Sequence, residues 1–175
     1  MENYCVGNES YVSDLCSLRG NVKIGSNCSI FDFASLRADM GKIVVGDFSN
    51  VQDNVSIHSD PGFDTVIGKY VSVGHNAVVH GCTIEDECLI GMGAIVMNGA
   101  KIGRGTVIAS GAVILENTII SENSMVAGVP GKVRSASTKY REMAHTNAEE
   151  YVSLKNHYLN GEFRNFVKDM DGKGL

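Results

Sequence analysis

An aliphatic side chain returns every six residues along most of this chain, and this period constrains the fold more than any other feature of the sequence. One unbroken series runs from Val6 to Leu36, and another runs from Ile84 to Val126. Between them stand two shorter series at the same spacing, which are Val45, Val51 and Ile57, and then Ile67, Val73 and Val79. A period of six suits short strands joined at corners, and it does not match the 3.6-residue period of a helix.

The fourth position after each aliphatic residue usually carries a small or slim side chain, as at Cys28, Ala34 and Ala94. Glycine often follows the aliphatic residue directly, as at Gly25 and Gly103, where the chain can turn. Two inward side chains per six residues predict a prism of short parallel strands around one aliphatic core. The pattern resembles the hexapeptide-repeat family, whose fold is a left-handed parallel β-helix with three units per coil. The left hand is implied by the resemblance alone, because parallel crossovers are usually right-handed.

Three of the five histidines, His58, His75 and His80, lie in the stretch from Ile57 to Gly81. If three units close one coil, His58 and His80 follow equivalent corner positions and lie one strand spacing apart, about 4.8 Å. Their rings would point outward at one edge, within reach of a single ion. His75 belongs to a different face, so one chain would supply only two of three ligands.

A ring of three chains would let His75 of a neighbour complete each site, and on this ground we expect a homotrimer. The breaks in the six-residue period point to the same edge. They are the steps from Leu36 to Val45, from Ile57 to Ile67 and from Val79 to Ile84. Each step leaves the corner that carries His58 and His80, and loops that interrupt a regular scaffold are where function is usually built.

Length, charge and cysteine usage exclude several classes of protein. A chain of 175 residues with 43% hydrophobic content is enough for one domain with a sizeable core. A formal net charge of −5 argues against a nucleic-acid or anionic-membrane surface, and no apolar run is long enough to cross a bilayer. The first ten residues lack the basic start and apolar stretch of a secretory signal. Cys16, Cys28 and Cys88 take slim inward positions, as reduced cysteines of a cytoplasmic protein would.

The repeat ends at Gly128-Val129-Pro130-Gly131, after which the composition becomes helical. We therefore expect a β-helix domain over residues 1–131 and a helical tail over residues 132–175 that packs along the prism. Thr146 and Glu149 have the spacing of a capping box, which predicts a helix start there, and a shorter helix is expected over residues 137–144. Tyr151, Leu154 and Tyr158 would share one helical face until Asn160 and Gly161 end the helix.

Three imidazoles around one divalent ion leave a fourth position for water, as in catalytic zinc sites. Zinc lowers the pKa of its bound water from 15.7 to about 7, and the resulting hydroxide suits attack on a small electrophilic carbon such as that of carbon dioxide. Zinc is therefore the expected metal, with cobalt, iron and nickel as alternatives for imidazole ligands. Cys82, two residues after His80, is a second candidate ligand or nucleophile, but thiolate chemistry needs an activating base or cation.

Eight segments resemble, in order and spacing, the signature of the gamma-class carbonic anhydrases. They are Leu36–Asp39, Asn50–Asn54, Ile57–His58, Val73–His75, Val79–Cys82, Ile90–Ala94, Val126–Pro130 and His145–Asn147. The likeness covers nearly the whole chain, and its three-histidine motif is specific.

The resemblance implies that His58, His75 and His80 bind the metal, and that Arg37 and Asp39 form an ion pair at the subunit interface. It also implies that Gln52 hydrogen-bonds the metal-bound water, with Asn50 and Asp53 beside it. Asp39 and Asp53 also have the chemistry to hold the guanidinium of Arg37.

Departures from the family pattern concern proton transfer. Ala38 replaces a usual glycine, and Met40 stands where the family's best-known members carry a glutamate. The segment over residues 59–66 is short, whereas those members have a long acidic loop. The chain therefore resembles the short-loop branch of the family. In this chain Asp60 or Tyr158 would carry the proton in place of the glutamates, or the site would bind metal and turn over slowly.

The expected function is the reversible hydration of carbon dioxide to bicarbonate by a zinc lyase. The same scaffold also serves hexapeptide acyltransferases, in which one histidine acts as a general base while coenzyme A lies between two prisms. A thioesterase acting on coenzyme A thioesters and a non-catalytic metal-binding trimer are also compatible with the sequence. Loss of metal on replacing each of His58, His75 and His80 would weaken the acyltransferase alternative.

Overall fold

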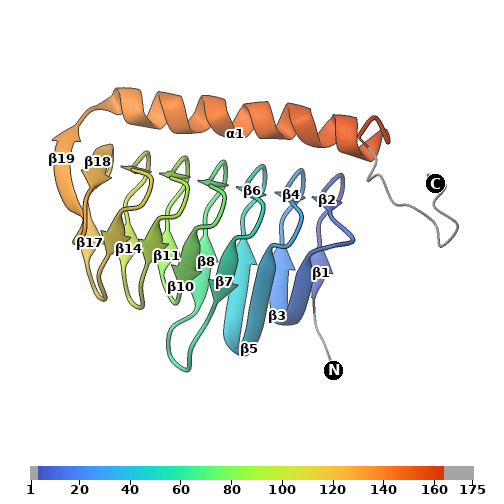
Figure 1. The fold of residues 1–175 in the computed structure, drawn as a ribbon, viewed down its shortest axis with the longest axis horizontal. Helices are drawn as coiled ribbons and strands as arrows, with labels where there is room; N and C mark the ends of the chain where they lie inside the picture. Colours follow the sequence, from blue (N-terminus) through green and yellow to red (C-terminus); the bar gives the residue numbers. More distant parts are fainter. Residues whose placement is uncertain (1–3, 164–175) are drawn as a thin grey trace, which may run out of the picture.

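The computed structural model describes residues 4–163, which form a three-faced prism of short strands with one long helix lying along it (Figure 1). Almost all strand pairs are parallel, and each strand pairs with its counterparts in the neighbouring coils. The six-residue period predicted the prism of parallel strands, and the fold is the left-handed parallel β-helix that the resemblance to the hexapeptide-repeat family implied.

Three columns of strands make the three faces. The first face contains β16 (Val113–Ile114), β13 (Ile95–Val96), β10 (Val78–His80), β7 (Ser56–His58) and the first halves of β5 (Ser35–Val45) and β3 (Ser17–Ile24). The second face contains β17 (Ile119–Ile120), β14 (Lys101–Ile102), β11 (Thr83–Ile84), β8 (Thr65–Ile67), the second halves of β5 and β3, and β1 (Cys5–Val6). The third face contains β19 (Lys132–Ala136), β18 (Ser124–Ala127), β15 (Val107–Ile108), β12 (Leu89–Ile90), β9 (Ser72–Val73), β6 (Asn50–Val51), β4 (Ser29–Ile30) and β2 (Tyr11–Val12).

The six-residue series forms the core. Every aliphatic member of the series from Ile24 to Val126 is at most 5% exposed, whereas Val6 at the N-terminal end is 37% exposed. Burying one such side chain stabilises the fold by about 1.5–3 kcal/mol. The steps that break the period all connect the first face to the second, as the pairing of β5 with both β7 and β8 shows.

A second regularity at the corners was not foreseen. The third residue after the aliphatic one has a positive φ in most units. These residues are Glu9, Asn27, Phe33, Phe48, Asn54, Tyr70, Asn76, Glu87, Gly93, Gly99, Gly105, Gly111, Asn117 and Asn123. Asparagine and glycine adopt this left-handed conformation with the least strain, which explains why they recur there.

Phe48, Tyr70 and Glu87 lie in successive coils at one corner and are neither asparagine nor glycine. The rings of Phe48 and Tyr70 stack with their centroids 4.7 Å apart, and the Tyr70 ring lies 4.5 Å from that of His145. Glu87 accepts a hydrogen bond from Nε of Arg141 at 2.5 Å. His145 and Arg141 belong to the helix, so these residues hold the helix against the prism.

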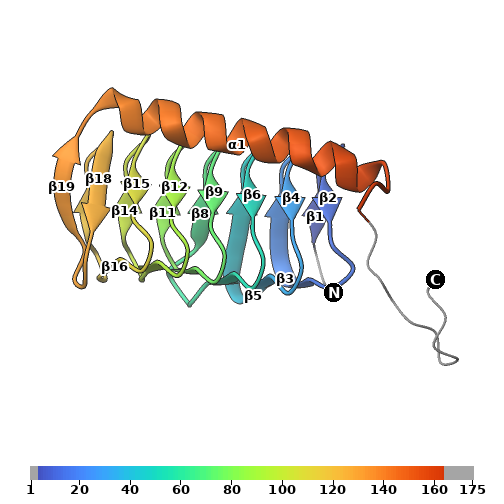
Figure 2. The same ribbon diagram turned by 45° about the horizontal axis from the view of Figure 1, so that its top comes forward.

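The helix α1 (Thr138–Leu159) runs the length of the third face, as Figures 1 and 2 both show. The expectation of a separate helix start at Thr146 is wrong. Ser137 caps one continuous helix, because its hydroxyl accepts from the amide of Lys139, and Thr146 lies in the helix interior. The expected end at Asn160 is confirmed.

The tail begins with a strand that the sequence did not suggest. The strand β19 pairs antiparallel with β18 directly after the turn that contains Pro130. The division into 1–131 and 132–175 stays a prediction, and residues 164–175 of the tail lie outside the described residues.

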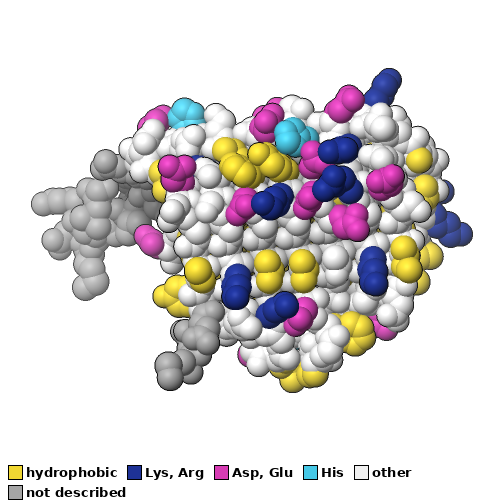
Figure 3. All heavy atoms as spheres, turned by 180° about the vertical axis from the view of Figure 1, so that it is seen from behind, with side chains coloured by type: hydrophobic (Ala, Val, Ile, Leu, Met, Phe, Trp, Pro, Cys, Tyr) yellow, Lys and Arg dark blue, Asp and Glu magenta, His cyan; other side chains and the backbone are white. Residues whose placement is uncertain are grey.

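Seen from behind, the surface carries lysine and arginine side chains interspersed with aspartate and glutamate, as Figure 3 shows. Ion pairs such as Lys69–Asp47 at 2.9 Å and Arg104–Asp86 at 2.7 Å link neighbouring coils. Positive and negative side chains are therefore mixed on this face, which does not form a charged patch of one sign. Within the described residues, α1 is too polar to cross a membrane.

Candidate metal centre

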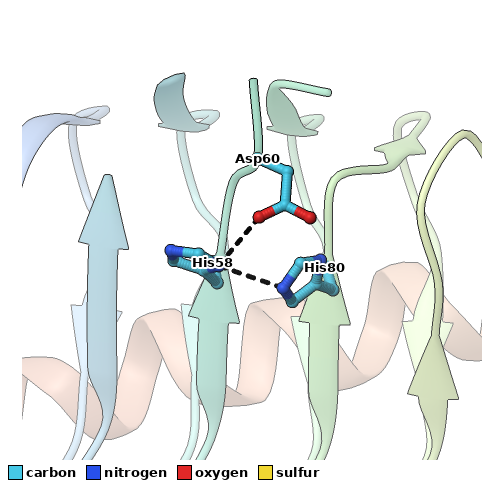
Figure 4. Close-up of side chains that lie close together, drawn as sticks. All are labelled: His58, Asp60 and His80. Atoms are coloured by element: carbon cyan, nitrogen blue, oxygen red, sulfur yellow. Dashed lines mark hydrogen bonds and ion pairs between the residues drawn. The ribbon is translucent and has the colours of Figure 1, made fainter. Parts of the chain in front are cut away.

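His58 and His80 lie side by side at the end of β7 and β10, where the strand register pairs them directly. Their ring centroids are 4.9 Å apart, and Nδ1 of His58 lies 3.0 Å from Nε2 of His80 (Figure 4). Both rings point outward from the same corner, as the three-unit coil predicted. The half-buried site stays open to small molecules.

The remaining ring nitrogens have partners that fix where the hydrogens lie. Nε2 of His58 is 3.1 Å from the Asp39 carboxylate, and Nδ1 of His80 is 2.6 Å from the amide oxygen of Asn98. Neither oxygen has a hydrogen to donate, so each of these nitrogens must donate its own. The two nitrogens that face each other across 3.0 Å are then left to share one cation, either a proton or a metal ion.

The orientation of Asn98 is itself determined by a carboxylate. Its amide nitrogen donates to Oδ2 of Asp60 at 3.0 Å, which leaves the amide oxygen for His80. The other oxygen of Asp60 lies 3.7 Å from Nδ1 of His58. Ligand atoms of His58, Asp60 and His80 all lie within 4.8 Å of one another. Among the described residues this is the cluster whose chemistry suits a metal ion.

The donor atoms fit a divalent ion. Two nitrogens bound to one zinc at 2.0–2.1 Å and a tetrahedral angle would be about 3.3 Å apart, close to the 3.0 Å between His58 and His80. Each imidazole also donates its other N–H to an oxygen, the arrangement that orients histidine ligands in metal sites. The residues present therefore suit the metal that the sequence implied.

Arg37 and Asp39 form the expected ion pair within one chain, with Nη1 of Arg37 at 2.9 and 2.6 Å from the two carboxylate oxygens. These hydrogen bonds, and then the one from His58, hold the pKa of Asp39 below its usual range. Both side chains are 47% exposed, so the pair adds little stability by itself. Asp53 does not share Arg37 within the chain, since it lies beside His75 instead.

His75 follows β9 on the third face, away from His58 and His80, as the register predicted. Its Nδ1 is 2.9 Å from the Asp53 carboxylate, and its amide donates to Oε1 of Gln52 at 3.2 Å. The amide group of Gln52 donates to Asn50 at 3.0 Å, and Asn50 donates to Ser72 at 2.8 Å. Gln52 and Asn50 are buried, so this second cluster has a fixed geometry.

Two tyrosines of α1 differ in where they lie. Tyr151 lines a hollow together with Gln52 and His75, whereas Tyr158 packs against Tyr11 and Phe31 with ring centroids 4.8 and 5.4 Å apart. A proton-carrying role for Tyr158 stays a prediction.

Cys82 is 2% exposed, and burial raises its pKa to about 12. At neutral pH its thiol is protonated. Its burial argues against the alternative of a thiolate ligand or nucleophile.

A hollow of about 240 Å³ opens beside His80 on the first face. Its walls are mainly apolar and come from Val78, Ile95 and Met97, with Asn98 and Glu116 at its polar side. An apolar hollow next to the histidines can admit a small nonpolar molecule.

The sequence analysis did not identify Asn98 or a ligand role for Asp60. Asp60 was considered only as a proton carrier. One signal was available, because Pro61-Gly62 predicts a tight turn that returns the chain directly after His58.

Comparisons with known proteins agree with this site. The family model described as bacterial transferase hexapeptide (six repeats) matches residues 64–98 and 81–116. The probable carbonic anhydrase of Methanocaldococcus jannaschii is 51% identical over 136 residues, which are 77% of this chain and 86% of that protein. The mitochondrial gamma carbonic anhydrase 1 of Arabidopsis thaliana is 41% identical over 99 residues, which are 53% of this chain and 36% of that protein.

Among solved structures, a putative acetyltransferase of Bacillus cereus superposes with a TM-score of 0.87 at 29% identity, over 91% of this chain and 93% of that one. The paired histidines and the relative from Methanocaldococcus jannaschii identify the family of this chain more specifically than the shared β-helix fold does. The chain belongs to the gamma carbonic anhydrase family of hexapeptide-repeat proteins.

Proposed function

We propose that the protein hydrates carbon dioxide reversibly to bicarbonate with a zinc ion held by His58 and His80 of one chain and His75 of a neighbour. The observation that carries the proposal is the pair of imidazole nitrogens 3.0 Å apart, in rings that are each held by an oxygen at the other ring nitrogen. A divalent cation would be bound by both of the facing nitrogens.

Zinc with an open position lowers the pKa of a bound water to about 7 and so supplies a nucleophile at neutral pH. The residues of the chain prepare the site for that chemistry. Asp39 and Asn98 orient the two imidazoles, and Arg37 holds Asp39 in place through two hydrogen bonds. The apolar wall of Val78 and Ile95 offers carbon dioxide a place beside His80.

The second cluster fits a contribution from a neighbouring chain. His75 is 40% exposed and lies on a different face from His58, so it is available to another subunit. Gln52 is fixed next to it and would bring its amide to the reacting water. A closed trimer repeats this contact three times by symmetry. A cytoplasmic location stays a prediction that rests on the five unpaired cysteines.

The test combines metal analysis with activity. Zinc content, sedimentation and stopped-flow hydration of carbon dioxide would be measured for the wild type and for His58→Ala, His75→Ala and His80→Ala. Each variant is expected to lose hydration activity by at least 10³-fold, since a ligand of the ion is gone, and His58→Ala and His80→Ala to retain less zinc than the wild type. His157→Ala is the control, because His157 pairs with Glu162 at the far end of α1. Zinc-loaded trimer without activity would contradict the proposal.

Acyl transfer is the second candidate, supported by the likeness to a putative acetyltransferase and by the apolar hollow next to a histidine. One histidine acting as a general base would suffice for it. Acetyl transfer from acetyl coenzyme A that is lost only in His80→Ala, in a protein free of metal, would favour this reading.

A further inference from the structure

We propose that Asp60 is a ligand of the metal, so that a single chain offers the ion two imidazoles and one carboxylate before a neighbour adds His75. The inference rests on the metal site of the proposed function and extends it, because the three histidines alone were the ligands expected from the sequence. It also gives the short segment after β7 a role of its own.

The geometry of the carboxylate supports this role. Its Oδ1 lies 3.7 Å from Nδ1 of His58 and points toward the space between the two rings (Figure 4). Its Oδ2 is occupied by the hydrogen bond from Asn98 at 3.0 Å. One oxygen is thus anchored by Asn98, and the other faces the same point as the two facing ring nitrogens. A carboxylate adds negative charge at that point, which favours a divalent cation there.

The turn after β7 holds Asp60 in this position. The amides of Asp60 and Phe63 each donate to the other's carbonyl, at 3.2 and 2.9 Å, around Pro61 and Gly62. Gly62 has a φ of +83°, as the third residue of a type II turn requires, and proline suits the position before it. Asp60 is therefore placed by the backbone, whereas a flexible loop would leave its side chain free.

Hydrogen bonds of Thr65, which follows the turn, hold the turn in place. The hydroxyl of Thr65 donates to the carbonyl of His58 at 2.5 Å and accepts from the amide of Gly81 at 2.9 Å. Gly81 has a φ of +55°, and a Cβ there would stand 2.2 Å from the Asn98 amide oxygen and 2.8 Å from Cβ of Phe63. Glycine at this position allows both side chains to close over the site.

An anionic ligand changes which ions the site favours. Two histidines and a carboxylate with open positions are typical of Fe²⁺ sites, and carboxylate oxygen also suits Mn²⁺ better than a purely imidazole site does. With His75 from a neighbour, the ion would have four protein ligands and would need to expand its coordination to hold water. Cobalt is the useful probe, because its visible spectrum reports the coordination number.

The experiment titrates metal-free trimer with Co²⁺ and follows heat and visible absorption. Asp60→Asn keeps the shape of the side chain and removes its charge, and it is expected to weaken Co²⁺ binding at least tenfold and to strengthen the absorption band as one ligand is lost. Asp64→Asn is the matched control from the same segment. Asp64 accepts from the amide of Lys42 and pairs with its ammonium group at 3.5 Å, so its loss should change affinity by less than twofold.

A second variant addresses the single-chain part of the proposal. In His75→Ala one Co²⁺ per chain should still bind, although more weakly, because three ligands remain. The proposal is overturned if Asp60→Asn matches the wild type in affinity and spectrum, or if His75→Ala binds no Co²⁺ in a folded protein. Asp60→Glu retains the charge and should bind more tightly than Asp60→Asn, which guards against a folding defect. A wild type that binds no Co²⁺ would sink the proposed function as well, whereas a change confined to Asp60→Asn leaves it standing.

Discussion

One column of outward side chains changes character along the prism. After the buried aliphatic residue, β5, β7 and β10 present Arg37, His58 and His80, each with polar partners, whereas β13 and β16 present Met97 and Leu115. Leu115 is 49% exposed and apolar. The inward positions of the same strands are equally buried in both regions. The scaffold is therefore uniform, and the difference between the regions lies outside the core.

The two regions differ in how the chain leaves the first face. In the later coils it reaches the second face with the plain six-residue step, and Gly99 takes the corner without a side chain. At the histidine coils the step is longer or shorter than six residues, and the additional residues supply Asp39 and Asp60. The carboxylate partners Asp39 and Asp60 thus lie where the period is broken, whereas the amide partner Asn98 lies in a regular step.

The largest expected effect tests whether the core is uniform. Ile57 and Ile114 are both at most 1% exposed in the same column. Replacement of either by alanine should cost about 2–5 kcal/mol of unfolding free energy, because a cavity replaces the removed atoms. Urea unfolding of Ile57→Ala and Ile114→Ala would measure it. A much smaller cost at Ile57 would mean that the histidine coils are packed more loosely than the later ones.

A smaller effect should separate the two regions at their corners. Gly81→Ala places a methyl group within 2.2 Å of Asn98, whereas Gly111→Ala, also at a positive φ, meets nothing within 4 Å. Gly111→Ala should cost about 1–2 kcal/mol from backbone strain alone, and Gly81→Ala should cost about 1–3 kcal/mol more from overpacking. Denaturant midpoints would compare them. Equal losses of unfolding free energy would show that the side chains of Asn98 and Phe63 move aside easily.

Buried threonines provide the next comparison. Thr65 bonds His58 and Gly81, and Thr106 bonds Ser121 and Ser124, with both threonines fully buried. Either change to valine should cost about 1–3 kcal/mol, because a buried hydrogen-bonding partner is left unsatisfied. Only Thr65→Val should also weaken Co²⁺ binding, since the Thr65 hydroxyl fixes the segment that carries Asp60. A Thr106→Val protein with weakened metal binding would contradict the separation of scaffold from site.

The smallest expected effect depends on pH and belongs to the scaffold. Burial raises the pKa of Cys88 to about 12, so the folded state keeps its proton at a pH where the unfolded chain releases it. The contribution is complete below the usual thiol pKa of about 8.5, and it falls as the pH rises from there toward 12. Between pH 8 and 9 the loss should be about 0.7 kcal/mol. Urea unfolding at both values should show a loss that is smaller by this amount in Cys88→Ala than in the wild type, because the variant keeps the raised pKa values of Cys28 and Cys82.

Much of the fold could be predicted because one aliphatic side chain in every six residues lies in the core. The aliphatic series located the strands, the broken steps located the irregular corner, and the register placed His58 against His80. The helix start was predicted wrongly, because Thr146 and Glu149 have capping spacing inside a helix that Ser137 already caps. The strand β19 has no such period, since it ends the sheet and its residues are exposed.

The site was less predictable where it depends on residues distant in sequence. Asn98 lies 18 positions after His80, and only the coil geometry brings the two together. Asp60 follows His58 by two positions, yet its direction is set by the Pro61-Gly62 turn and by the amide of Asn98. Motif spacing conveys which residues share a corner, and it does not convey which way a carboxylate points.

The helix along the third face changes how this solenoid can unfold. Coils of a repeat protein normally contact only their neighbours, so the ends of such a protein can fray independently. Here α1 contacts β2, β4, β6, β9 and β15, which belong to coils far apart along the prism. Opening one terminal coil therefore requires detachment of a segment that also covers the opposite end. Amide hydrogen exchange should report protection shared across the strands under α1, as in a single cooperative unit.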